Sequence, residues 1–144
     1  MQINGEWLLF DGDIVRPVIR GEILTNERLW QPAEFLVDTG ADRTVFSAAT
    51  LSKLGLQPIV AQERLGGLSG LVDAVVVATQ LQRTRETGSK VVFRGHYAAV
   101  TAVEALDVCV LGRDITGLCT VLVDQPGDIV CLLGQRHRYT IVQG

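Results

Sequence analysis

Residues 35–46 read FLVDTGADRTVF, and they restrict the possible folds of this chain more than any other segment. Two apolar runs typical of buried strands, 35–37 and 44–46, enclose a sharp corner that begins at Asp38. Gly40 in this corner tolerates unusual backbone conformations and allows another backbone to approach closely. The segment therefore predicts a carboxylate held at the end of a buried strand, where packed scaffolds commonly place chemistry.

The Asp-Thr-Gly tripeptide alone is ambiguous, because an aspartate that bonds its own backbone is common in turns. Two distant segments favour a chemical role: residues 65–70 read LGGLSG, and residues 108–114 read VCVLGRD. In this order, the three segments resemble the catalytic loop, the flap and the Gly-Arg-Asp segment of retropepsin-like aspartic proteases, the family of the retroviral enzymes. The resemblance covers residues 16–130, and the long tail after Leu118 is closer to the cellular and bacterial relatives.

Short apolar runs separated by turn signals predict mostly β structure. The expected strands are 7–10, 14–24, 33–37, 72–78, 90–101 with an interruption at Gly95-His96, 119–123, 129–133 and 136–142. One helix is predicted at 47–55, with Ser47 as its N-cap and Gly55 as its stop, and one helical turn at 114–118. The expected fold is all-β: a small, closed, β-barrel-like half of an acid protease (retropepsin-like) with one or two short helices.

The length and the net charge of the chain limit its number of domains and the kinds of partner that we expect. A chain of 144 residues is expected to form one domain, residues 1–144. Its net charge of −3 gives no electrostatic footprint for nucleic acid. No apolar run has the length of a membrane span, and residues 1–13 lack the pattern of a signal peptide. We therefore expect neither nucleic acid nor a membrane among the partners.

The cysteines and histidines suggest no metal site and no cofactor. Cys109, Cys119 and Cys131 lie in apolar runs without a Cys-x-x-Cys pair, which predicts reduced, mostly buried thiols in a cytoplasmic protein. A catalytic cysteine is the less favoured alternative. His96 and His137 lie in unrelated segments and indicate neither a zinc site nor a catalytic triad.

Peptide hydrolysis without a metal or a covalent nucleophile requires two neighbouring carboxylates, one acting as base and one as acid. The chain has one Asp-Thr-Gly and is too short for a two-lobed enzyme. The simplest second carboxylate is Asp38 of another copy across a two-fold axis, which is also what the resemblance implies. An intrachain partner, Asp107 or Asp114, is the alternative, although Asp114 matches the structural aspartate of the Gly-Arg-Asp segment.

The resemblance also implies roles for individual residues. Asp38 is the catalytic carboxylate, Thr39 hydrogen-bonds across the dimer, and Arg113 supports the site through a partly buried ion pair with Asp42. Substrate-binding roles follow for Gly40, Ala41, Asp42, Gly66, Gly67 and Leu68. The structural alternatives are a surface cation at Arg113 and a simple hairpin turn at 65–70.

Together these features predict an aspartic endopeptidase that uses no cofactor and acts as a homodimer on a peptide or protein substrate. An extended peptide between flap and floor would bind as an added strand. The alternative is a non-catalytic, dimeric peptide-binding domain on the same scaffold, since a fold alone does not give activity.

Overall fold

The computed structural model describes residues 2–67, 70–85, 87–134, 140, 142 and 143. Its strands are β1 (Gln2–Asn4), β2 (Glu6–Phe10), β3 (Ile14–Leu24), β4 (Trp30–Val37), β5 (Val45–Phe46), β6 (Val60–Gly67), β7 (Gly70–Thr84), β8 (Lys90–Val100), β9 (Cys109–Leu111), β10 (Thr120–Asp124) and β11 (Ile129–Leu133). Its helices are α1 (Ala48–Leu54) and α2 (Arg113–Thr116), with 3-10 turns η1 (Asp11–Asp13) and η2 (Val103–Ala105). None of the described helices is long and apolar enough to cross a membrane.

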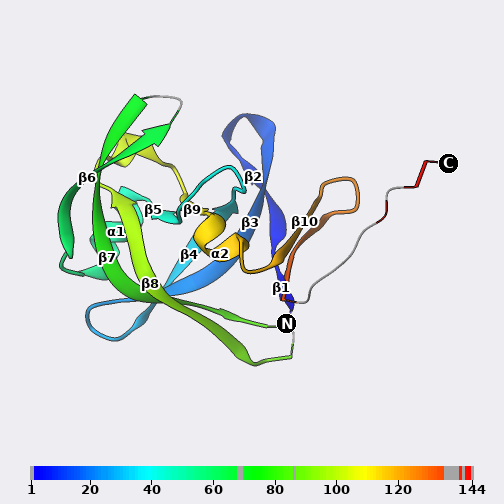
Figure 1. The fold of residues 1–144 in the computed structure, drawn as a ribbon, viewed down its shortest axis with the longest axis horizontal. Helices are drawn as coiled ribbons and strands as arrows, with labels where there is room; N and C mark the ends of the chain where they lie inside the picture. Colours follow the sequence, from blue (N-terminus) through cyan, green and yellow to red (C-terminus); the bar gives the residue numbers. More distant parts are fainter. Residues whose placement is uncertain (1, 68–69, 86, 135–139, 141, 144) are drawn as a thin grey trace.

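The larger sheet closes on itself. Its strand order is β2-β3-β4-β9-β5-β8-β7-β6, and β3 also pairs with β7, where Glu22 faces Gln82 and Ile23 faces Leu81. This additional pairing joins β3, β4, β9, β5, β8 and β7 into a ring, with β2 and β6 outside it (Figure 1). The predicted all-β, closed, barrel-like fold with short helices is confirmed.

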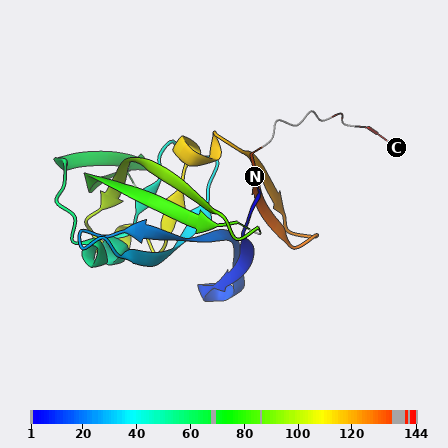
Figure 2. The same ribbon diagram turned by 90° about the horizontal axis from the view of Figure 1, so that it is seen from below.

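A second sheet, of order β1-β11-β10, lies at one end of the barrel (Figure 2). The indole nitrogen of Trp7 on β2 donates to the carbonyls of Asp124 and Ile129, both at 3.2 Å, and so fastens the β10–β11 hairpin to the barrel. These two strands agree with the runs predicted at 119–123 and 129–133. The strand predicted at 136–142 falls mostly outside the described residues, and residues 140 and 142 are in no strand.

The helix predicted at 47–55 is confirmed together with both of its caps. The hydroxyl of Ser47 accepts a hydrogen bond from the Thr50 amide at 3.2 Å, and Gly55 ends α1 in the left-handed region with φ 63°. The interruption predicted in the strand at 90–101 is wrong. Gly95 stays paired within β8. A larger residue at this position would be crowded, because its Cβ would lie 3.3 Å from the ring of Tyr97.

The core beneath the Asp38 corner is aromatic. Phe46 is fully buried and lies between Phe35, with ring centroids 6.3 Å apart, and Tyr97, at 5.6 Å. Truncating a buried phenylalanine typically costs about 3–5 kcal/mol, so this cluster fixes β4 and β5 firmly. The strand end that carries Asp38 therefore rests on a rigid floor.

Candidate active site

Parallel strands β4 and β9 bring the two distant motifs together. In their register Phe35 pairs with Cys109 and Val37 with Leu111, so the residues that follow, Asp38 and Gly112, leave the same end of the sheet. The backbone amide of Asp38 still donates to the carbonyl of Leu111 at 3.2 Å. The sequence motifs at 35–46 and 108–114 thus form one structural unit.

The corner itself is held by hydrogen bonds to Asp38. The Gly40 amide donates to Oδ1 of the carboxylate at 2.9 Å, and the Ala41 amide donates to the Asp38 carbonyl at 3.2 Å. A Cβ on Gly40 would stand 3.2 Å from Oδ1, so glycine leaves room for the carboxylate. Within the described residues, Oδ2 of Asp38 accepts no hydrogen bond. The turn interpretation is correct as geometry, and one carboxylate oxygen is left available for chemistry.

A partly buried polar network supports the far side of the loop. The carboxylate of Asp114 accepts from the amide of Thr44, at 3.0 Å from each oxygen, and from the Thr44 hydroxyl at 2.7 Å. The same hydroxyl accepts from the Gly112 amide at 3.1 Å, and Thr44 is fully buried. The role of Thr44 was not identified from the sequence, although its position two residues after Asp42 belongs to the motif.

Arg113 contacts the loop from the protein surface. Its Nη1 donates to the Thr39 carbonyl at 2.8 Å, its backbone amide donates to the Ala41 carbonyl at 2.8 Å, and its Nη2 forms an ion pair with Asp42. The predicted contact between Arg113 and Asp42 is therefore confirmed. The prediction that it is partly buried is wrong: the side chains are 50% and 82% exposed, because Arg113 opens helix α2 at the surface.

The glycine-rich segment forms a hairpin, as predicted. Gly66 on β6 pairs with Leu71 on β7, and Gly67 pairs with Gly70. Among the described residues, a Cβ on Gly67 would meet nothing within 4 Å. Leu68, the predicted flap tip, lies outside the described residues.

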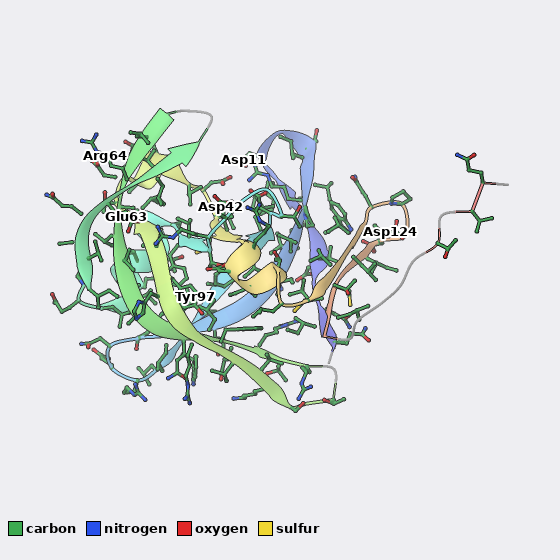
Figure 3. All side chains as sticks on the ribbon, in the orientation of Figure 1. Asp11, Asp42, Glu63, Arg64, Tyr97 and Asp124 are labelled. Carbon is green, nitrogen blue, oxygen red and sulfur yellow. The ribbon has the colours of Figure 1, made fainter. Side chains whose placement is uncertain are left out.

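An ion pair joins this hairpin to the loop. Nη1 of Arg43 lies 2.5 Å from Oε1 of Glu63 on β6. Figure 3 shows Asp42, Glu63 and Arg64 in one region of the molecule, where the loop meets the hairpin. Sequence analysis assigned no role to Arg43 or Glu63. A cation directly after Asp42 and an acid two residues before the glycine-rich segment were the available signals.

Both intrachain candidates for a second carboxylate are engaged elsewhere. Asp107 accepts from Arg16 Nη1 at 3.0 and 3.3 Å, and Asp114 is held by Thr44. Among the described residues, no group of three or more His, Cys, Asp or Glu side chains could hold a metal ion. Of the three carboxylates considered, Asp38, Asp107 and Asp114, only that of Asp38 keeps an oxygen without a partner among the described residues.

Burial raises the pKa of two thiols and of one tyrosine in this part of the chain. Burial raises the pKa of the Cys119 and Cys131 thiols, which lowers their thiolate fraction at neutral pH. Burial, with a smaller contribution from the Asp114 charge, raises the pKa of Tyr97 to about 12. All three cysteines, including the buried Cys109, are free thiols.

Comparisons with known proteins agree with this geometry. No curated protein sequence matches the chain. The solved structures that resemble it include a retropepsin-like aspartic protease from Rickettsia conorii, with 16% identity, a TM-score of 0.56, and coverage of 92% of this chain and 88% of that one. They also include the EIAV protease complexed with the inhibitor HBY-793, with 23% identity, a TM-score of 0.51, and coverage of 76% and 92%. At these identities the structural likeness shows the fold.

The family is shown by a sequence model. The model described as aspartyl protease matches residues 19–115, about two thirds of the chain. This segment includes the strand that leads to Asp38, the β6–β7 hairpin and the residues that brace the loop, Gly112 to Asp114. The chain is therefore an aspartic-type peptidase and belongs to the aspartyl protease family.

Proposed function

We propose that this protein is an aspartic endopeptidase whose catalytic dyad consists of Asp38 from each of two identical subunits. The observation that carries the proposal is the availability of the Asp38 carboxylate. It stands half-buried at a rigid strand end with Oδ2 unbonded within the described residues, whereas Asp107 and Asp114 are engaged. We also propose that residues 1–144 act as one domain.

The dyad would work by sharing a proton. Two carboxylates about 3 Å apart cannot both ionise, so one stays protonated beside one that is charged. The ionised group takes a proton from water as the water attacks the peptide carbonyl, and the protonated group donates to the carbonyl oxygen. Acid–base help of this kind contributes about 10²–10⁴ in rate, and positioning of the substrate must supply much of the rest.

Positioning is the role we propose for the residues around Asp38. Gly40, Ala41 and Asp42 would line the substrate backbone, and an extended peptide would bind as an added strand beneath the flap residues Gly66, Gly67 and Leu68. Thr39 is exposed, its carbonyl accepts from Arg113, and its hydroxyl makes no hydrogen bond among the described residues, so we propose that this hydroxyl bonds to the second subunit. The three free thiols are consistent with a reducing, cytoplasmic location.

The first test replaces the proposed base. Asp38→Asn keeps the shape of the side chain but removes its ability to ionise, so cleavage of a peptide library, followed by mass spectrometry, should fall to background. Asp107→Asn is the matched control, because it alters a surface carboxylate paired with Arg16 and should leave cleavage near the wild-type rate. Full activity of Asp38→Asn would refute the assignment. Specific peptide binding without cleavage by the wild-type protein would instead favour the non-catalytic binding domain.

The second test addresses the shared site. If each dimer holds one dyad, a heterodimer of wild-type and Asp38→Asn subunits is inactive. After subunit exchange in an equal mixture at high concentration, activity should fall to about a quarter of that of the same total amount of wild-type protein. Activity per subunit should also decline on dilution. A mixture that retains half of the activity would contradict a dyad built from two subunits.

A further inference from the structure

The ion pair between Arg43 and Glu63 connects two segments that are separated along the sequence. Arg43 lies in the loop that follows Asp38, and Glu63 lies on β6, the first strand of the flap hairpin. Nη1 of Arg43 is 2.5 Å from Oε1 of Glu63, and the side chains are only 37% and 31% exposed. This contact links the hairpin to the catalytic loop through side chains.

The loop end of this link is rigid. The residue after Arg43 is the fully buried Thr44, which is held by Asp114. Gly112 lies against the backbone of Arg43 so closely that a Cβ there would come within 2.3 Å of the Arg43 carbonyl. The backbone of Arg43 is therefore fixed in place and would not move with Glu63.

A β-bulge in β6 determines the direction of the Glu63 side chain. Between Val60 and Glu63 the register of β6 against β7 shifts, so that Glu63 pairs with Ala74. Directly paired residues share one face of an antiparallel sheet, so Glu63 lies on the same face as Ala74, which is 2% exposed. If the register did not shift after Val60, Glu63 would pair with Asp73 instead, on the opposite face and beside a like charge. Bulges commonly re-aim a side chain in this way.

We propose that the Arg43–Glu63 pair is a positioning strap that holds the base of the flap hairpin at a fixed height above the catalytic loop. The inference rests on the proposed function, because the strap matters only if substrate binds between flap and loop. Because Glu63 lies on β6 before Gly66 and Gly67, the pair sets the position of these two residues relative to the loop. Arg43 and Glu63 act through the flap and are not catalytic residues.

The test is a double-mutant cycle with Arg43→Gln, Glu63→Gln and the double variant. Each single variant should raise KM for a cleaved peptide about three- to tenfold, with a smaller change in kcat, because a half-buried ion pair is of modest strength. The double variant should match either single variant, since the second substitution has no pair left to break. Added salt should raise KM of the wild-type protein and leave that of the double variant nearly constant.

The matched control is the other ion pair of the same hairpin. Arg64 and Asp73 lie on the face of the hairpin opposite to Glu63, 3.8 Å apart and 71% and 80% exposed, and among the described residues no ion pair joins either of them to the loop. Arg64→Gln should leave KM and its salt dependence unchanged. Effects of Arg43→Gln and Glu63→Gln that multiply in the double variant would overturn the strap, since each residue would then act alone.

Hydrogen exchange separates this inference from the proposed function. In the free wild-type protein and in Glu63→Gln, exchange is compared at the amides of residues 60–67 and of α1. The strap predicts faster exchange for Glu63→Gln in 60–67 only, whether or not any peptide is cleaved. If the wild-type protein cleaves no peptide while this difference is present, the proposed function fails and the strap remains. Unchanged exchange in 60–67 would overturn the strap even in an active enzyme.

Discussion

Replacing Thr44 with valine tests whether the buried network beneath the loop holds the candidate site together. Valine has nearly the same shape as threonine but lacks the hydroxyl that accepts from the Gly112 amide and donates to Asp114. Leaving a buried amide without a partner costs about 1–3 kcal/mol. The lost bond to Asp114 adds only about 1 kcal/mol, because water can reach that carboxylate. The expected loss is about 2–4 kcal/mol, a large part of the total stability of a typical domain.

Thr44→Ser is the matched control. It keeps the hydroxyl and removes one buried methyl group, which costs about 1 kcal/mol. The free energy of unfolding is measured by urea denaturation at one fixed protein concentration, because dimerisation would add to apparent stability. Thr44→Val should be the less stable variant and should lose activity in proportion to its unfolded fraction, or more. If Thr44→Ser is as destabilised as Thr44→Val, packing matters and the hydrogen-bond argument is refuted.

Two further predictions concern the surface and the floor of the site. Arg113→Ala should cost only about 1 kcal/mol in stability, because its pair with Asp42 is exposed. It should lower kcat/KM more than this loss explains, since the Thr39 carbonyl is released. A loss of stability without a loss of kcat/KM would contradict this role. Stability should also fall between pH 10 and pH 12. In the unfolded state Tyr97 releases its proton near pH 10, whereas in the folded state its pKa is about 12 and the proton is retained. The free energy of unfolding should therefore decrease by about 2–3 kcal/mol as the pH rises through this range. Urea unfolding of Tyr97→Phe, which should lack this part of the slope, checks the assignment.

The features that sequence analysis predicted correctly depend on neighbours along the chain. The helix at 47–55 follows from a capping serine and a terminating glycine, and both lie where expected. The corner at Asp38 follows from an apolar strand that ends in Asp-Thr-Gly. The closed sheet follows from the number and spacing of short strands, although no local pattern specifies that β3 pairs with β7.

The features that it missed depend on contacts between distant residues. Thr44 and Asp114 are 70 positions apart, and only the parallel pairing of β4 and β9 brings their segments together. Arg43 and Glu63 meet because a bulge turns one strand, which no composition or periodicity predicts. The exposure of Arg113 was misjudged because an apolar run precedes it, whereas the chain turns outward into α2 at that residue.

Under the proposed function, the contacts around Asp38 indicate which groups the chain holds by itself and which are left for a second subunit. The chain fixes the loop through the Asp38 amide, the Thr39 and Ala41 carbonyls and the Thr44 side chain. It leaves Oδ2 of Asp38 and the hydroxyl of Thr39 without hydrogen bonds among the described residues. A rigid loop with two outward polar groups is prepared to meet a copy of itself without rearranging, so little ordering cost opposes formation of the dyad. Under this arrangement the dimer dissociation constant sets the concentration at which activity begins.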